Sequence, residues 1–245
     1  MNLTPFLIPD WPAPAGVRAA VTTRQGDGVS QPPFERFNLG ARCGDAAEAV
    51  AANRASLERM LGLPSPPRWL HQVHGAAVVE MDRAAAAEPE ADAAVARGSD
   101  VLAILTADCL PVLFCADDGA VVGAAHAGWR GLAAGVLEAT AARMGVPGER
   151  LLAWLGPAIG PRSYEVGADV RDAFVRTDPG AAAAFAPTRP GHWRCDLYAL
   201  ARRRLAAAGV TRVYGGGFDT FADARFYSFR RDRATGRFAS LIWRG

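Results

Sequence analysis

Cysteine and histidine are scarce in this chain of 245 residues, which contains four of each. The cysteines show no short paired spacing, which excludes a disulfide framework and a structural zinc ribbon. The formal net charge is only +2, so the composition gives no reason to expect nucleic acid as a partner. No stretch reaches the ~20 apolar residues that would span a bilayer.

The N-terminal segment, MNLTPFLIPDWPAP, lacks the basic region and long apolar core of a signal peptide. We therefore expect a cytoplasmic protein without a membrane association, and nothing in the sequence implies a partner protein. Half of the residues are hydrophobic, so the chain can bury a full core. We expect one domain over residues 1–245.

Short strands and helices alternate along the chain, and at least two hairpins are antiparallel. This combination predicts an α/β (α+β) fold, a mixed-sheet layered sandwich. One hairpin turns at Asp117-Asp118-Gly119, and the second pairs residues 226–231 with 237–243. The hydrophobic patterns predict further strands at 17–23, 76–81, 151–155 and 211–215, and helices at 46–61, 131–144, 166–176 and 196–208.

Three residues have the chemistry and the sequence surroundings of a metal-binding site or a reactive thiol site. They are His71 in WLHQVHG, Cys109 in LTADCLP and His126 in AAHAGWRG. Cysteine and histidine are soft ligands, and each residue ends or follows an apolar run. With a two-residue loop at Asp117-Asp118, Cys109 faces His126 across the hairpin, with Cβ atoms about 4.5 to 5.5 Å apart. The three residues together predict a metal-binding or thiol-reactive site.

Other interpretations remain for the single residues. A cysteine such as Cys109 often packs as a small hydrophobe, and Cys115 is expected in the core. His74 follows His71 at i+3, and a strand or irregular turn would not place both on one face, so we expect only one as a ligand. We favour His71, with His74 beside the ligands or at the surface. His192 is expected in a loop.

Several segments in order resemble the YfiH family of bacterial proteins, which carry the labels multicopper polyphenol oxidase, laccase-like protein and purine nucleoside phosphorylase, and whose mammalian relative is FAMIN. The resemblance covers nearly the whole chain. Its segments are TTRQGDGVS, FNLGARCGD, WLHQVHG, TADCLPVLF, AAHAGWRG, LGPAIGPRSYEV and FYSFRRDRATGRFASLIW.

The resemblance implies that His71, Cys109 and His126 bind a catalytic zinc, although copper would suit the same donors. It implies an enzyme that cleaves inosine, adenosine and methylthioadenosine with phosphate, and that also deaminates adenosine. Three protein ligands leave one position of zinc open for a water whose pKa is lowered to ~7. Deamination also needs an acid/base residue, for which Asp108 and His74 are candidates.

Phosphorolysis requires groups that bind phosphate and the nucleoside. Arg24, beside the glycine loop, and Arg130, after Gly128-Trp129, are candidate phosphate contacts, although a structural salt bridge would explain either arginine. Gln72 and Asn38 are candidates for contacts to the base or the ribose hydroxyls. The C-terminal arginines either meet a phosphate or form a solvated hairpin face; they are Arg230, Arg231, Arg233 and Arg237.

Three other functions are open at this stage. Cys109 with His126 as its base would make an amide hydrolase, for which the resemblance suggests cell-wall precursors as substrates. A copper-dependent phenol oxidase fits one copper site, but four histidines are too few for a multicopper relay and cluster. A non-enzymatic binding protein would hold metal without turning over a nucleoside.

Overall fold

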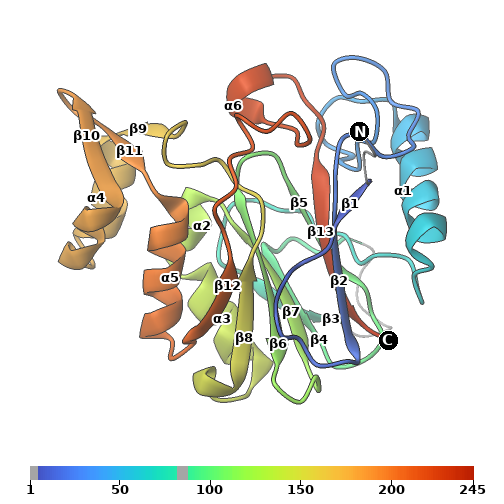
Figure 1. The fold of residues 1–245 in the computed structure, drawn as a ribbon, viewed down its shortest axis with the longest axis horizontal. Coiled ribbons are helices and arrows are strands. Elements are labelled where there is room, and N and C mark those ends of the chain that lie inside the picture. The colour runs from blue at the N-terminus through green and yellow to red at the C-terminus, as the bar shows by residue number, and fades with distance from the viewer. Residues whose placement is uncertain (1–4, 82–87) are drawn as a thin grey trace.

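The computed structural model describes residues 5–81 and 88–245. Its described part is a mixed α+β fold with three sheets (Figure 1). The first sheet has the order β1 (Phe6–Leu7), β2 (Val17–Thr22), β13 (Phe238–Arg244), β5 (Leu102–Thr106). The second has the order β12 (Arg212–Gly215), β8 (Leu151–Leu155), β6 (Leu110–Ala116), β7 (Val122–Ala127), β4 (Ala93–Ala96), β3 (Val78–Met81). The third has the order β10 (Phe185–Arg189), β11 (His192–Cys195), β9 (Glu165–Gly167).

The helices pack against the two larger sheets, and some of them lie between the six-stranded sheet and the three-stranded sheet (Figure 1). The α-helices are α1 (Ala47–Leu61), α2 (Trp129–Ala134), α3 (Val136–Met144), α4 (Ala168–Val175), α5 (Leu197–Ala207) and α6 (Phe229–Asp232). Two 3-10 helices are η1 (Gly148–Arg150) and η2 (Pro179–Ala184). Among the described helices, none has the length and apolar character needed to cross a membrane.

The strand β6 shows how the layers are built. Because side chains alternate along a strand, Val112 and Phe114 face one way and Leu113 and Cys115 the other. The first pair packs with residues of α2, α3 and α5. The second pair packs against β5 and β13 of the four-stranded sheet. The opposite face of that sheet is covered by α1, so the predicted layered sandwich is confirmed.

Most predicted elements occur with small changes at their ends. Helix α1 ends at Gly62, whose φ of 56° favours glycine. The predicted helix over 131–144 is divided into α2 and α3 by Gly135, which has a φ of 92°. At 166–176, residues 165–167 form β9 and only the later residues are helical.

The predicted C-terminal hairpin is wrong. Strand β13 lies between β2 and β5 and pairs antiparallel with both, so neither of its edges is free for residues 226–231. Phe226 and Tyr227 are fully buried instead. Ser228 then caps α6, because its hydroxyl accepts a hydrogen bond from the backbone N–H of Arg231. This short helix places residues of the 229–232 segment near the site described below.

Candidate active site

The β6–β7 hairpin brings Cys109 and His126 together. Strand β6 begins directly after Cys109, and His126 lies near the end of β7. The observed register pairs Pro111 with His126, two residues away from the predicted pairing. A shift of two residues keeps the same face of a strand, so the hairpin is confirmed although its register differs.

The turn before Cys109 is braced by a carboxylate. Asp108 has a φ of 89°, in the left-handed region that non-glycine residues rarely occupy. Its two carboxylate oxygens accept hydrogen bonds from the Thr220 hydroxyl at 2.6 Å and the Arg230 backbone N–H at 2.7 Å. Asp108, expected as an acid/base candidate, therefore holds the chain conformation that presents Cys109.

His74 reaches the same place from an irregular turn. Its φ is 65°, and the backbone N–H groups of residues 73–75 donate to the carboxylate of Asp92 over 2.6 to 3.2 Å. This turn sets the His74 ring edge-on to the His126 ring, with 4.7 Å between centroids. The His74 Nε2 atom lies 3.8 Å from Cys109 Sγ.

Close approach at this point depends on Gly128. A Cβ atom added there would lie 3.0 Å from both Cys109 Sγ and His74 Cδ2. The glycine that follows His126 by two residues in AHAGWRG therefore leaves room for the other two side chains.

His74, Cys109 and His126 form the group of metal-binding donors in the described part of the chain, with ligand atoms within 4.8 Å of one another. In a tetrahedral zinc site, bonds of 2.0 to 2.3 Å place ligand atoms about 3.3 to 3.8 Å apart. The three donors therefore need to move by only about 1 Å to hold such an ion. Two imidazoles and one thiolate suit zinc, and also copper.

The preference for His71 as a ligand needs correction, because the structure places His74 in the group instead. His71 pairs its backbone with residues 89–91. Its Nδ1 atom lies 3.8 Å from Glu90 Oε2, and its side chain is 41% exposed. The expectation that only one of the two histidines would serve agrees with the geometry. His192, at the start of β11, bonds the carbonyl of Pro190.

Asp92 also orients His126. The two side chains are buried, and His126 Nδ1 lies 2.8 Å from Asp92 Oδ1. This contact leaves Nε2 of the ring for a metal or for the thiol. Burial tends to raise the pKa of Asp92, but hydrogen bonds from His126 and the backbone of Gly75 and His74 hold it below its usual value.

The thiol and its neighbouring imidazole shift each other's pKa. Burial alone would raise the pKa of Cys109, but the charge of His126 and hydrogen bonds from His126 and His74 lower it to about 6. Burial opposes the charged form of His126, yet Cys109 and Asp92 raise its pKa to about 9. In the metal-free site, a thiolate therefore faces an imidazolium at neutral pH. The thiolate is the form that binds metals and acts as a nucleophile.

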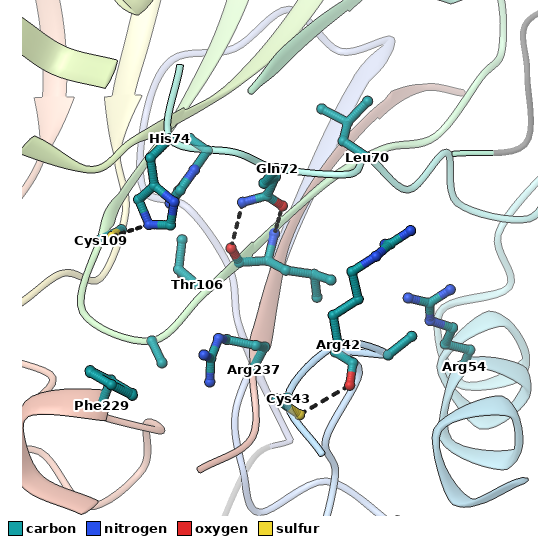
Figure 2. A pocket seen from close by; sticks show the side chains of 15 residues that line it. Arg42, Cys43, Arg54, Leu70, Gln72, His74, Thr106, Cys109, Phe229 and Arg237 are labelled. Carbon is teal, nitrogen blue, oxygen red and sulfur yellow. Dashed lines mark hydrogen bonds between the residues drawn. The ribbon is translucent and has the colours of Figure 1, made fainter. Parts of the chain in front are cut away.

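The three donors open into a pocket of about 380 Å³. Figure 2 shows His74 and Cys109 at one end, Arg42 and Arg54 at the other, and Arg237 between them. Phe229 of α6 lies on the side of Cys109 and is 50% exposed. The other lining residues are Gly40, Ala41, Cys43, Leu70, Gln72, Leu105, Thr106, Ala107 and His126.

Of the four predicted substrate contacts, Gln72 lines the pocket. Its amide exchanges two hydrogen bonds with the backbone of Leu105, at 2.8 and 2.9 Å. Gln72 therefore joins the His74 segment to the end of β5, and these bonds already use one amide N–H and the amide oxygen.

The other three lie outside the pocket lining. Arg24 pairs with Glu35 at 3.3 Å and with Asp232 at 3.7 Å, which matches the salt-bridge alternative. Arg130 stacks over Trp129, with 4.3 Å from its guanidinium carbon to the ring centroid. Asn38 is fully buried, and its Oδ1 accepts from the backbone N–H of Arg237 at 2.8 Å.

Sequence reasoning missed Asp92 and Phe229, and it named Arg237 only within a run. A carboxylate within the apolar segment ADAAVA is a signal for Asp92, because a buried acid needs partners. Phe229 gave no signal, since the predicted strand placed it on a hairpin. No sequence signal separates Arg237 from the neighbouring arginines, whereas the structure places it in the pocket lining.

Comparisons with known proteins identify the family of this chain. Residues 18–245 match the family model described as multi-copper polyphenol oxidoreductase laccase. A protein of Pseudomonas aeruginosa named purine nucleoside phosphorylase is 58% identical over 240 residues, covering 97% of this chain and 98% of its own. Purine nucleoside phosphorylase YfiH of Escherichia coli is 49% identical over 243 residues, covering 98% and 99%.

Solved structures show the same fold. A Neisseria meningitidis protein superposes with a TM-score of 0.95 at 50% identity, covering 98% of this chain and 99% of its own. YlmD from Geobacillus stearothermophilus superposes with a TM-score of 0.92 at 33% identity, covering 100% and 97%. The architecture described above is thus shared over nearly the full length of these relatives.

Proposed function

The chain belongs to the multi-copper polyphenol oxidoreductase laccase family, and we propose that within this family it is a zinc-dependent purine nucleoside phosphorylase. The proposed substrates are inosine, adenosine and methylthioadenosine together with phosphate, and adenosine deamination is a side activity. We assign the catalytic unit to one domain over residues 1–245. Support comes from the names of near full-length relatives at 49% to 58% identity.

The observation that carries this proposal is the pocket that joins the metal-binding donors to a wall of arginines. His74, Cys109 and His126 would hold the zinc ion, with His74 in the place expected for His71. A bound zinc ion would supply Lewis acidity at the open end of the group. Asp92 fixes the His126 ring so that Nε2 faces the donors.

Phosphorolysis makes clear demands on such a pocket. A phosphate oxygen forms a bond to C1′ of the ribose, the C1′–N9 bond breaks with its electron pair on the purine, and the purine takes up the proton that hydrogen phosphate loses. Positive charge develops on the ribose, while the phosphate brings negative charge that cationic side chains can hold. The exposed ring of Phe229 offers a face on which a purine can stack. The pocket thus contains a cationic region and an aromatic surface.

Phosphorolysis is favoured over deamination as the main reaction. Deamination needs a free acid/base group near the base. Both oxygens of Asp108 already accept hydrogen bonds, and His74 belongs to the donor group. Neither of the two expected candidates is therefore well placed for that task.

A thiol hydrolase is the second candidate function, since one observation favours it. Cys109, His126 and Asp92 lie in the order nucleophile, base and orienting carboxylate, and the Cys109 pKa is lowered to about 6. An amide of a cell-wall precursor would then be the substrate. Metal binding and nucleophilic attack compete for the same sulfur atom, so chelation would inactivate the phosphorylase but not the hydrolase.

Multicopper oxidase chemistry is not supported by the donors. The chain has four histidines, and neither His71 nor His192 belongs to the donor group. A single copper ion in place of zinc would fit the same three residues, but no cluster of several copper ions would.

The decisive experiment measures hypoxanthine released from inosine by zinc-loaded protein, with and without phosphate. We expect phosphate-dependent release that is abolished by His74→Ala and by chelation, and restored by zinc in the wild type. The matched control is His71→Ala, which removes the neighbouring histidine outside the group and should retain activity. Release that is independent of phosphate, or lost in His71→Ala but kept in His74→Ala, would contradict the proposal.

A further inference from the structure

We propose that Arg237 forms the phosphate-binding subsite of this pocket, with the guanidinium group as its main anion contact. This inference rests on the proposed function, because it names the place where the second substrate binds. It singles out one residue from the four arginines of the C-terminal run.

The charge around Arg237 is the first argument. Its Nη1 donates to the carbonyl oxygens of Thr235 at 2.8 Å and Gly236 at 3.0 Å. Within the described residues, no carboxylate lies within ion-pair distance of its guanidinium group. The two carbonyl oxygens fix the orientation of the planar guanidinium group but do not neutralise its positive charge. A half-buried cation without a carboxylate partner favours the binding of an anion.

The other arginines of the run have different surroundings and do not line the pocket. Arg230 stacks over Tyr164 and donates to the carbonyl of Glu165. Arg231 pairs with Asp232 at 2.9 Å and bonds three backbone carbonyls. Arg233 is exposed. Only Arg237 combines a pocket position with an uncompensated charge among these four.

The rest of the wall strengthens the field at Arg237. Arg42 and Arg54 share one carboxylate, Glu88, at 2.6 and 3.1 Å. The described lining residues include no aspartate or glutamate. This end of the pocket thus has three guanidinium groups and one carboxylate beside two of them, so it carries an excess of positive charge.

The stem of Arg237 is held in place before any ligand arrives. Asn38 Oδ1 accepts its backbone N–H at 2.8 Å. A Cβ atom added to Gly40 would lie 2.7 Å from Arg237 Cγ, so the glycine packs directly against the stem. A cation fixed in this way loses little side-chain entropy when it binds, which favours affinity.

Thr106 offers a second polar group at the same wall. Its hydroxyl is buried and makes no hydrogen bond within the described part of the chain. Buried hydroxyls are normally bonded, so the unbonded hydroxyl of Thr106 is a further candidate contact for a phosphate or ribose oxygen. Figure 2 shows Thr106 between Cys109 and Arg237, which suits a reacting centre between the metal donors and the phosphate.

The test measures inorganic phosphate binding to the full chain by calorimetry without a nucleoside, and then steady-state kinetics with inosine. For Arg237→Gln we expect phosphate affinity to fall about 10-fold or more, the KM for phosphate to rise equally, and the KM for inosine to change less than about twofold. Arg237→Lys should fall between wild type and Gln, because it keeps the charge and loses the fork.

Arg202→Gln is the matched control. Arg202 also donates to two backbone carbonyls, those of Val213 and Gly215, and does not line the pocket. It should bind phosphate like the wild type. A folded Arg237→Gln protein with wild-type phosphate affinity, or with equal losses for phosphate and inosine, would overturn the inference.

Two further measurements distinguish a failure of the phosphate-subsite assignment from a failure of the proposed function. Phosphate binding that depends on Arg237 in a protein that releases no hypoxanthine would support the subsite and reject the proposed function. Titration with inosine 5′-monophosphate distinguishes free phosphate from the phosphate of a nucleotide. Binding of the nucleotide without any binding of inorganic phosphate would overturn the assignment to the second substrate of phosphorolysis.

Discussion

Replacing Asp92 by Asn tests the central support of the site. The Asp92 carboxylate accepts four hydrogen bonds, two at each oxygen. One oxygen binds His126 Nδ1 and the N–H of His74, and the other binds the N–H groups of Val73 and Gly75. An asparagine keeps one acceptor oxygen and turns an NH₂ group toward two donors. It therefore loses two bonds and the negative charge beside His126.

The size of the effect follows from these contacts. Hydrogen bonds to a charged acceptor contribute about 1.5 to 3 kcal/mol each. The backbone groups of residues 73–75 are partly exposed and can bind water instead, which places the loss of unfolding free energy near the lower end, about 3 kcal/mol. Loss of a carboxylate that orients a metal-binding histidine weakens metal affinity about 10- to 100-fold.

Two measurements check this prediction. Urea unfolding of the metal-free protein, followed by circular dichroism, gives the stability, and competition with a chelating dye gives the zinc affinity. Asp118→Asn is the control, because Asp118 also accepts a backbone N–H and pairs with an arginine but is exposed. Its urea midpoint and zinc affinity should equal those of the wild type. Wild-type values for Asp92→Asn in both assays would refute the reasoning.

The remaining predictions concern Cys109 and Phe229. The Cys109 pKa of about 6 lies below its usual value, so its thiolate persists as the pH falls toward 6. Alkylation of metal-free protein by iodoacetamide should rise through pH 6 and level off above pH 7, and a midpoint near pH 8.5 would contradict this shift. Burial raises the pKa of Cys115 and Cys195 to about 12, so both should stay unlabelled. Phe229→Ala should raise the KM for inosine about 10-fold through lost stacking and leave that for phosphate unchanged. Phe221→Ala, an exposed phenylalanine outside the pocket lining, is its control, and equal KM values for the two variants would argue against stacking.

Local signals predicted the parts of the fold that depend on neighbouring residues. The turn at Asp117-Asp118-Gly119 produced the β6–β7 hairpin and with it the proximity of Cys109 and His126. The predicted helix over 196–208 corresponds to α5, which Asp196 caps by accepting the N–H of Ala199. These features need only a few consecutive residues, so a single sequence contains the information for them.

The remaining features depend on contacts between segments far apart in the sequence, which local patterns do not predict. The partners of β13 are β2 and β5, and Ser240 pairs with Val21 from the other end of the chain. A turn signal near residue 235 favoured a local hairpin, but burial of β13 between two strands outweighs it. The choice between His71 and His74 failed for a related reason. The left-handed conformation of His74 is stabilised by Asp92, which no local pattern connects to it.

Asn38 supports the site from within the core and does not line the pocket. Its motif suggested a contact to substrate, yet Asn38 is fully buried and holds the backbone of Arg237. Gln72, two residues before His74, likewise bonds the backbone of Leu105, and Asp108, next to Cys109, accepts the backbone N–H of Arg230. Polar residues in the motif segments therefore fix the conformation of the chain, while a few side chains face the pocket. Because a cation or thiolate acts only when it is held at the right place, variants of these supports should alter metal and phosphate affinity without touching either ligand.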